Sequence, residues 1–190
     1  MIGEVLTHIT RVHEAAMRNA RAVAIRSVVY LFALVTLLAA PRLASAQISV
    51  GGFLGAEFDN QDNWLLFGAE GRFSLRKAMN GPWDFNPRLS YHSYGGGASA
   101  TQIDLNLLYD LELAHPGRFA PYVGIGGTLV TFKAGDLSES HTGLNLITGV
   151  KLVTKDSGIE PFMNTQYSII PSYPNSYTLV FGALFRIGGR

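Results

Sequence analysis

Three histidines are the residues of greatest chemical interest in residues 47–190 of this chain. His92 precedes Ser93, His115 lies in a short run of turn-forming residues, and His141 follows Ser138, Glu139 and Ser140. Nucleophilic catalysis requires a serine, a histidine and a carboxylate within hydrogen-bond reach of one another. The pattern around His92 predicts a strand, so Ser93 points to the opposite face and cannot reach it. We therefore expect polar loop and lumen residues here, with no catalytic site.

The sequence supports a metal site no better. The chain has no cysteine, and scattered histidines do not form a transition-metal site. Asp136 and Glu139 share one predicted loop and could hold Ca²⁺ weakly, but a solvated loop is the simpler interpretation. The run Gly95-Gly-Gly97 lacks the strand-to-helix context of a phosphate-binding loop. We expect neither a metal nor a cofactor.

The element that best reveals how these residues are positioned is the stretch 101–113. Every odd position from Ile103 to Leu113 is apolar, and all but one of the even positions are polar or charged. A period of two is the signature of a strand, because successive side chains leave opposite faces. Thirteen residues are long for a soluble strand but suit a tilted strand crossing a bilayer, which needs about nine to eleven.

Seven more segments share this strand character, and turn-forming residues separate them. The eight predicted strands are 47–58, 64–76, 83–94, 101–113, 121–132, 142–153, 159–170 and 177–187. Their connections are short, whereas a parallel crossover needs a dozen residues or more. The prediction is an all-β, eight-stranded antiparallel up-and-down barrel. With the N-terminus in the periplasm, the outward connections would be 59–63, 95–100, 133–141 and 171–176.

The first 46 residues have the features of a cleaved signal peptide. A basic region precedes fourteen apolar residues, 27–40, too few for the roughly twenty of a membrane-spanning helix. Ala44 and Ala46 then form a small-x-small cleavage site before Gln47. A start at Met17 would give an ordinary signal, 17–46. The predicted domains are therefore a signal peptide, 1–46, and a barrel, 47–190.

Charge excludes some classes of partner. The signal holds five of the chain's 15 basic residues and two of its 14 acidic ones, so residues 47–190 carry a net charge of −2. A nucleic-acid-binding domain would show a basic stripe instead. The absence of cysteine also means that no disulfide framework holds an exported protein of this sequence together.

The two faces of the predicted strands differ in size as well as polarity. One face carries Leu, Ile, Phe, Tyr and Trp without a charge, and the other carries charged residues among many glycines and serines. An eight-stranded barrel has an interior just wide enough for side chains, so the smaller, charged face belongs inside and the apolar face meets lipid. Strand 121–132 is the least regular, because Tyr122, Val130 and Phe132 share its glycine face.

Charges inside a barrel must pair. Alternating strand directions place Lys151, Glu160 and Arg186 at similar depth on neighbouring strands. The same argument groups Glu70, Arg72 and Arg88. We predict two structural ion-pair clusters that plug the lumen.

The segments 120–127 and 142–150 carry a resemblance to a known family. Ala120-Pro-Tyr-Val-Gly-Ile-Gly-Gly127 and Thr142-Gly-Leu-Asn-Leu-Ile-Thr-Gly-Val150 resemble strands of the small outer-membrane β-barrels of the OmpA transmembrane-domain, OmpX and OmpW type. The chain departs from the family in ending on Gly188-Gly-Arg190 rather than on an aromatic residue, and it has no peptidoglycan-binding domain. The resemblance implies an eight-stranded barrel in the outer membrane of a Gram-negative-type bacterium.

The function predicted from these features is that of an integral outer-membrane protein with a structural or surface-interaction role and no enzymatic activity. Its expected partners are outer-membrane lipids, lipopolysaccharide, the barrel-assembly machinery and periplasmic chaperones. Two alternatives stay open: a lipid-modifying outer-membrane enzyme, and a soluble periplasmic barrel of the lipocalin kind that binds a ligand in an apolar cavity. The ligand of the surface loops is not evident from the sequence.

Overall fold

The computed structural model describes residues 47–58, 63–111, 118–154, 158–171 and 174–187. The signal peptide, with Ala44 and Ala46, and the turn containing His115 lie outside the described residues. Those two features therefore stay predictions. No helix in the described part of the chain is long and apolar enough to cross a membrane.

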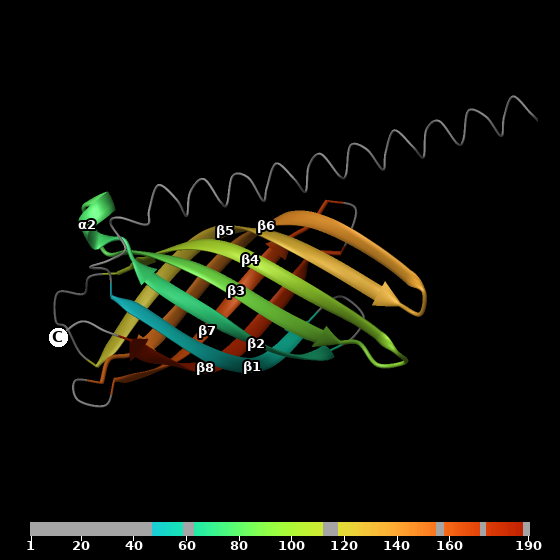
Figure 1. The fold of residues 1–190 in the computed structure, drawn as a ribbon, viewed down its shortest axis with the longest axis horizontal. Coiled ribbons are helices and arrows are strands. Elements are labelled where there is room, and N and C mark those ends of the chain that lie inside the picture. The colour runs from blue at the N-terminus through green and yellow to red at the C-terminus, as the bar shows by residue number, and fades with distance from the viewer. Residues whose placement is uncertain (1–46, 59–62, 112–117, 155–157, 172–173, 188–190) are drawn as a thin grey trace, which may run out of the picture. The chain divides into compact units, whose positions relative to one another are not determined.

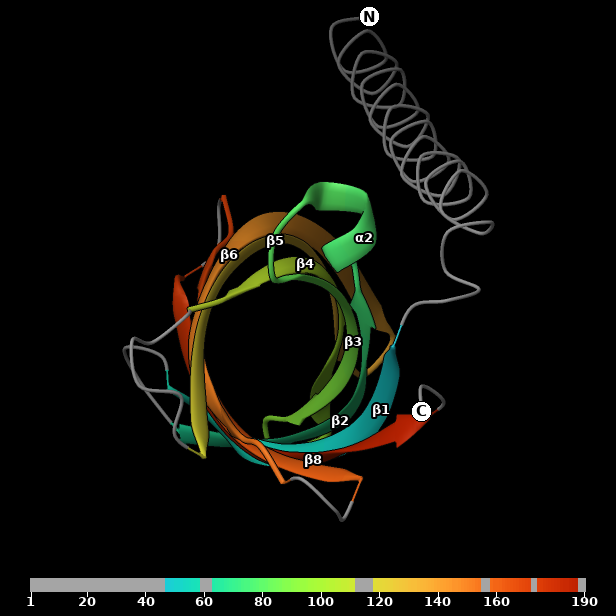
Figure 2. The same cartoon turned by 90° about the vertical axis from the view of Figure 1, so that its left-hand side faces the viewer.

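Eight antiparallel strands form one closed barrel (Figures 1 and 2). They are β1 Ile48–Phe58, β2 Asn63–Ser74, β3 Trp83–Ser93, β4 Ala98–Asp110, β5 Phe119–Ala134, β6 Leu137–Leu152, β7 Ile159–Ile169 and β8 Ser176–Ile187. Each strand pairs with its neighbours in sequence, and β8 pairs with β1 from Ile187↔Ile48 to Tyr177↔Phe58. The predicted fold class and up-and-down order are confirmed.

The one described helix is a single turn, α2, Arg76–Met79, at the end of the barrel where β1 begins. We call this the α2 end. The tight turns of β3–β4 and β5–β6 lie at the opposite end, which we call the hairpin end. The sequence predicted β2 to reach residue 76, but it stops at Ser74 and the chain turns into α2. Asn80 ends this turn in the left-handed conformation, at φ 46°.

The barrel is apolar outside and polar inside. Large apolar side chains from all eight strands face outward, among them Leu54, Leu65, Ile125, Leu146 and Phe181, all more than half exposed. Most of the buried side chains are polar or charged. The argument from side-chain size therefore assigned the two faces correctly, including Tyr122 and Val130, which are buried in the lumen.

Inward glycines receive the larger lumen side chains of neighbouring strands. Tyr122 pairs with Gly149, and a Cβ added at Gly149 would lie 2.5 Å from the Tyr122 ring. Phe53 is paired with Gly68 on one side and Gly182 on the other. This alternation of ring and glycine lets a narrow barrel hold aromatic residues inside. The apolar lumen positions Phe53, Leu66, Phe162, Val180 and Leu184 form one buried cluster that the sequence did not predict.

The β5–β6 connection differs from its prediction as a loop, 133–141. The two strands continue pairing to Ala134↔Leu137, and only Gly135 and Asp136 form the turn. Gly135 adopts φ 58°, the left-handed conformation that two-residue hairpin turns require. The Gly-Asp pair carried this signal, but the polar residues beside it favoured a loop. His141 consequently lies in a strand, and β4 likewise begins at Ala98, inside the predicted loop 95–100.

We expect Gly149→Ala to destabilise the folded barrel by about 1–3 kcal/mol, the usual effect of overpacking, because the new methyl group collides with Tyr122 and Asn164. Gly127→Ala is the matched control, since the nearest atom to its added Cβ is 4.0 Å away. Urea unfolding in detergent micelles, followed by tryptophan fluorescence, measures both variants. Equal midpoints would refute the ring-over-glycine packing.

Candidate functional site in the barrel lumen

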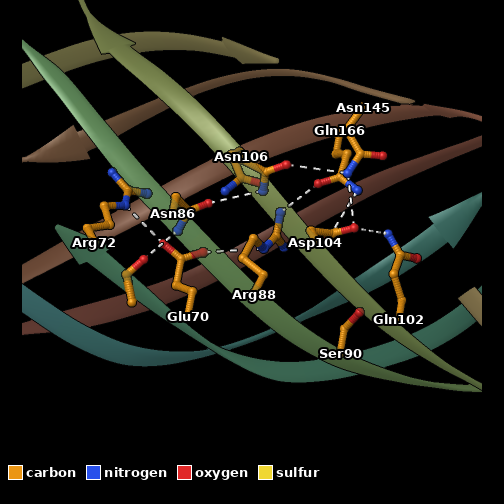
Figure 3. Close-up of polar contacts among 12 residues, drawn as sticks. Glu70, Arg72, Asn86, Arg88, Ser90, Gln102, Asp104, Asn106, Asn145 and Gln166 are labelled. Carbon is orange, nitrogen blue, oxygen red and sulfur yellow. Dashed lines mark hydrogen bonds and ion pairs between the residues drawn. The ribbon is translucent and has the colours of Figure 1, made fainter. Parts of the chain in front are cut away.

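The centre of the lumen is an ion-pair cluster of Glu70, Arg72 and Arg88 (Figure 3). Arg72 donates from Nε to Glu70 Oε1 over 3.0 Å, and Arg88 Nε lies 3.4 Å from Glu70 Oε2. All three residues are buried. The carboxylate therefore lies between two guanidinium groups, one from its own strand and one from its partner on β3, Glu70↔Arg88.

Aromatic rings cover both guanidinium groups. Arg72 Cζ lies 4.5 Å from the centre of the Tyr122 ring and 5.0 Å from that of Phe162. Arg88 Cζ lies 4.5 Å from the centre of the Phe53 ring. A cation over an aromatic face is stabilised by the quadrupole of the ring, the more so when water is excluded. These rings thus complete the environment of the central cluster.

An amide-rich layer continues the network towards the hairpin end (Figure 3). The Asp104 carboxylate accepts hydrogen bonds from Gln102 at 2.8 Å and from Asn145 at 3.0 Å. Arg88 Nη1 donates to Gln166 Oε1 over 2.9 Å, which ties this layer to the central cluster. Asn and Gln are both donors and acceptors, so they can satisfy buried polar groups in a ring of strands.

The α2 end of the lumen holds a second group of charges around a cavity of about 230 Å³. Lys151 donates to Asp110 over 2.7 Å and lies 3.7 Å from Asp84. Arg186 is hydrogen-bonded to Glu160. Arg76 reaches Asp110 at 3.6 Å from the exposed α2 turn. The charged lining is therefore one of paired groups open to the α2 end.

The hairpin end holds a Ser–His–Glu arrangement. Ser90 Oγ lies 2.9 Å from His92 Nε2, and His92 Nδ1 lies 2.6 Å from Glu57 Oε2. Tyr94 donates its hydroxyl to the same Glu57 oxygen over 3.0 Å. These distances suit a nucleophile, a base and an orienting acid. Ser90 is, however, only 5% exposed, and it lines neither the cavity at the α2 end nor a second cavity found at the hairpin end.

Aromatic rings line this second cavity, which lies at the hairpin end and has a volume of about 490 Å³. Trp64 packs edge-on against Tyr94, and Tyr94 stacks on Phe132 with ring centres 6.0 Å apart. Phe132 in turn meets His141, whose ring nitrogen lies 3.6 Å from Glu139. The two ends of the lumen thus offer different chemistry, charged at the α2 end and aromatic at the hairpin end.

No protein-family model matches the chain, and no curated sequence is similar to it. Solved structures do match. Neisserial surface protein A is 11% identical with a TM-score of 0.57, over 75% of this chain and 97% of that one. The N-terminal β-barrel domain of Pseudomonas aeruginosa OprF is 17% identical at 0.52 (75% and 99%), and outer membrane protein OprG of the same species 14% identical at 0.52 (76% and 97%).

The chain has the fold of the small eight-stranded outer-membrane β-barrels. Sequence identities of 11–17% establish a shared fold and nothing about function. The chemistry of this outer-membrane-type barrel must therefore be argued from its own lumen.

The structure places the predicted lumen residues as follows. Glu70, Arg72 and Arg88 form one contacting group. In the second predicted group, Arg186 contacts Glu160, whereas Lys151 reaches across β5 to Asp110. Ala120, the β5 partner of Lys151, is small and leaves the lysine room to cross that strand. The role of these pairs as a structural plug stays a prediction.

Sequence reasoning missed two parts of this outer-membrane-type lumen. It tested His92 against Ser93 but not against Ser90, although residues two apart share a face of a strand. It also gave Tyr122 no role, although Tyr122 accepts hydrogen bonds from Arg72 at 2.9 Å and Asn164 at 3.2 Å. For metals, no group of three or more His, Cys, Asp or Glu gathers among the described residues.

We expect Arg88→Leu to destabilise this barrel by about 3–5 kcal/mol, because it leaves the buried Glu70 with one cationic partner fewer. Arg186→Leu should lower the melting temperature less, since Arg186 is partly exposed at the rim. Thermal melts of the detergent-folded protein measure both. Adding Glu70→Gln to Arg88→Leu should recover part of the loss; an unchanged melt for both single variants would contradict the plug.

Proposed function

We propose that residues 47–190 are an integral outer-membrane β-barrel without catalytic activity. The observation that carries this proposal is the inverted polarity of the barrel. Exposed apolar side chains surround a lumen of paired charges. Closure of the barrel also gives every strand edge a hydrogen-bonding partner, which lipid cannot supply. A soluble barrel of the lipocalin kind would need the opposite arrangement, with an apolar cavity and a polar exterior.

The proposed role is structural or one of surface interaction, in a Gram-negative-type outer membrane. The α2 end, which carries both chain ends of the barrel, would face the periplasm, and the hairpin end would face outside. Lipopolysaccharide and lipids would contact the apolar belt, and assembly would use periplasmic chaperones and the barrel-assembly machinery. Support for a plugged lumen comes from the burial of Glu70, Arg72 and Arg88, each 5% exposed or less.

A second candidate function, lipid modification, has one specific observation in its favour, the Ser90–His92–Glu57 arrangement. Burial of Ser90 speaks against it, because an acyl chain would have to reach a hydroxyl that lines neither end cavity. The same contacts satisfy a buried carboxylate, which is explanation enough for their presence.

We expect the purified barrel to release no fatty acid from labelled lipopolysaccharide above the rate of its Ser90→Ala variant. Treatment with a fluorophosphonate, which labels activated serines covalently, should likewise give no adduct on Ser90. Ser138→Ala, on the exposed hairpin, controls for adventitious labelling. Hydrolysis that disappears in Ser90→Ala would overturn the non-catalytic proposal and establish the second candidate.

The membrane proposal predicts that position along the barrel decides whether an exterior arginine is tolerated. Leu146 is 53% exposed and pairs with Ile125 in the apolar belt, whereas Leu137 is 76% exposed at the hairpin tip. Leu146→Arg should cost about 2–4 kcal/mol, as an arginine at mid-membrane does, and Leu137→Arg should be neutral. Unfolding in lipid vesicles measures this. Equal tolerance of both, with recovery in the soluble periplasmic fraction, would instead indicate a soluble barrel.

A further inference from the structure

The cavity at the α2 end contains a buried cation with an unused donor. Arg72 is only 4% exposed and lines this cavity. Its Nε donates to Glu70 and its Nη2 to Tyr122, but Nη1 is buried without any hydrogen-bond partner. An unsatisfied buried donor is unfavourable, and more so on a charged group. Arg72 therefore lines the cavity and keeps one buried N–H donor for which the described residues supply no acceptor.

A second arginine at the same height has the same property. Ser49 on β1 pairs with Arg72 on β2 and with Arg186 on β8, so the three side chains form a row across adjacent strands. Directly opposed side chains in an antiparallel sheet have Cβ atoms about 5 Å apart. The Nε of Arg186 is also buried without a partner, although its Nη2 is hydrogen-bonded to Glu160.

The middle member of this row gives the site its shape. Ser49 is small and lines the cavity between the two arginine positions, and its hydroxyl can donate a hydrogen bond. The lining includes a second serine, Ser74. Four cationic side chains line the cavity, Arg72, Arg76, Lys151 and Arg186, against three carboxylates, Asp84, Asp110 and Glu160. The fourth cation of the lining, Arg72, is paired with Glu70, so an anion would be held through the unused N–H donors of the arginines.

We propose that the Arg72–Ser49–Arg186 row binds a small oxyanion, a phosphate or carboxylate group, in the cavity at the α2 end. Planar guanidinium groups suit the oxygens of both groups, and charge-assisted hydrogen bonds are the strongest of their kind. A volume of about 230 Å³ admits a free anion or a small metabolite bearing one. The site goes beyond the proposed function: a barrel that inserts into membranes but binds no anion leaves that function intact.

Calorimetric titration of the detergent-extracted full chain with inorganic phosphate tests the site, with ionic strength held constant by exchanging chloride. We expect one saturable site per barrel and at least tenfold weaker binding in Arg72→Gln. Ser49→Val should abolish binding while keeping both arginines, which a purely structural role of the charges would not explain. Arg186→Gln gives an independent test if Arg72→Gln fails to fold.

Arg118→Gln is the matched control, because Arg118 is exposed at the same end but does not line the cavity. It should bind phosphate as the unaltered protein does. Acetate in place of phosphate separates the two oxyanion classes, and binding of either supports the site. The proposal would be overturned if neither anion released more heat than chloride does, or if Ser49→Val and Arg186→Gln bound phosphate as the unaltered protein does. Water would then be the partner of Arg72 Nη1.

Discussion

Closure of β8 onto β1 is the constraint on which the rest of the structure depends. It pairs the backbone of every strand on both sides, and it also fixes a lumen only as wide as eight strands allow. Side chains that point inward must therefore interlock with one another, and any charge among them loses most of its water. The Glu70 carboxylate between Arg72 and Arg88 is a response to that loss. Such pairs add little net stability, but removing one member is costly, so they specify one arrangement of the lumen.

Packing and electrostatics in this lumen use the same side chains. Tyr122 occupies the space over Gly149, Phe53 the space over Gly68, and both rings also cover a guanidinium group. A methyl group on either glycine would displace the ring and expose the arginine beneath it. Each lumen ring therefore needs a glycine on the neighbouring strand. This requirement explains why the charged face carries many glycines and has a small average side-chain volume.

Alternation along each strand was enough to predict the fold, because a period of two identifies a strand and also shows which residues share each of its faces. Position 108 shows this: Leu108 stands among polar inward residues in the sequence and is buried in the lumen. What alternation could not supply is contact across the barrel. Lys151 and Glu160 were expected to meet from their depth, yet Lys151 crosses β5 at Ala120 to reach Asp110. Such contacts depend on strand tilt and on side-chain reach, which no single strand encodes. Glu57 and His92 illustrate the same limit, since they come from non-adjacent strands, β1 and β3.

The two cavities differ because the central network lies between them. A path joining the charged α2 end to the aromatic hairpin end would have to separate Arg88 from Glu70 and from Gln166. Breaking a buried pair of this kind costs about 3–5 kcal/mol. A difference of 1.4 kcal/mol is a factor of ten in population, so at such a cost an open state would be populated at about one per cent or less. A molecule entering from one side would therefore meet only the chemistry of that side. With such a separation, the proposed oxyanion site at the α2 end would not require a conducting pore, and the two mouths of the barrel would act independently.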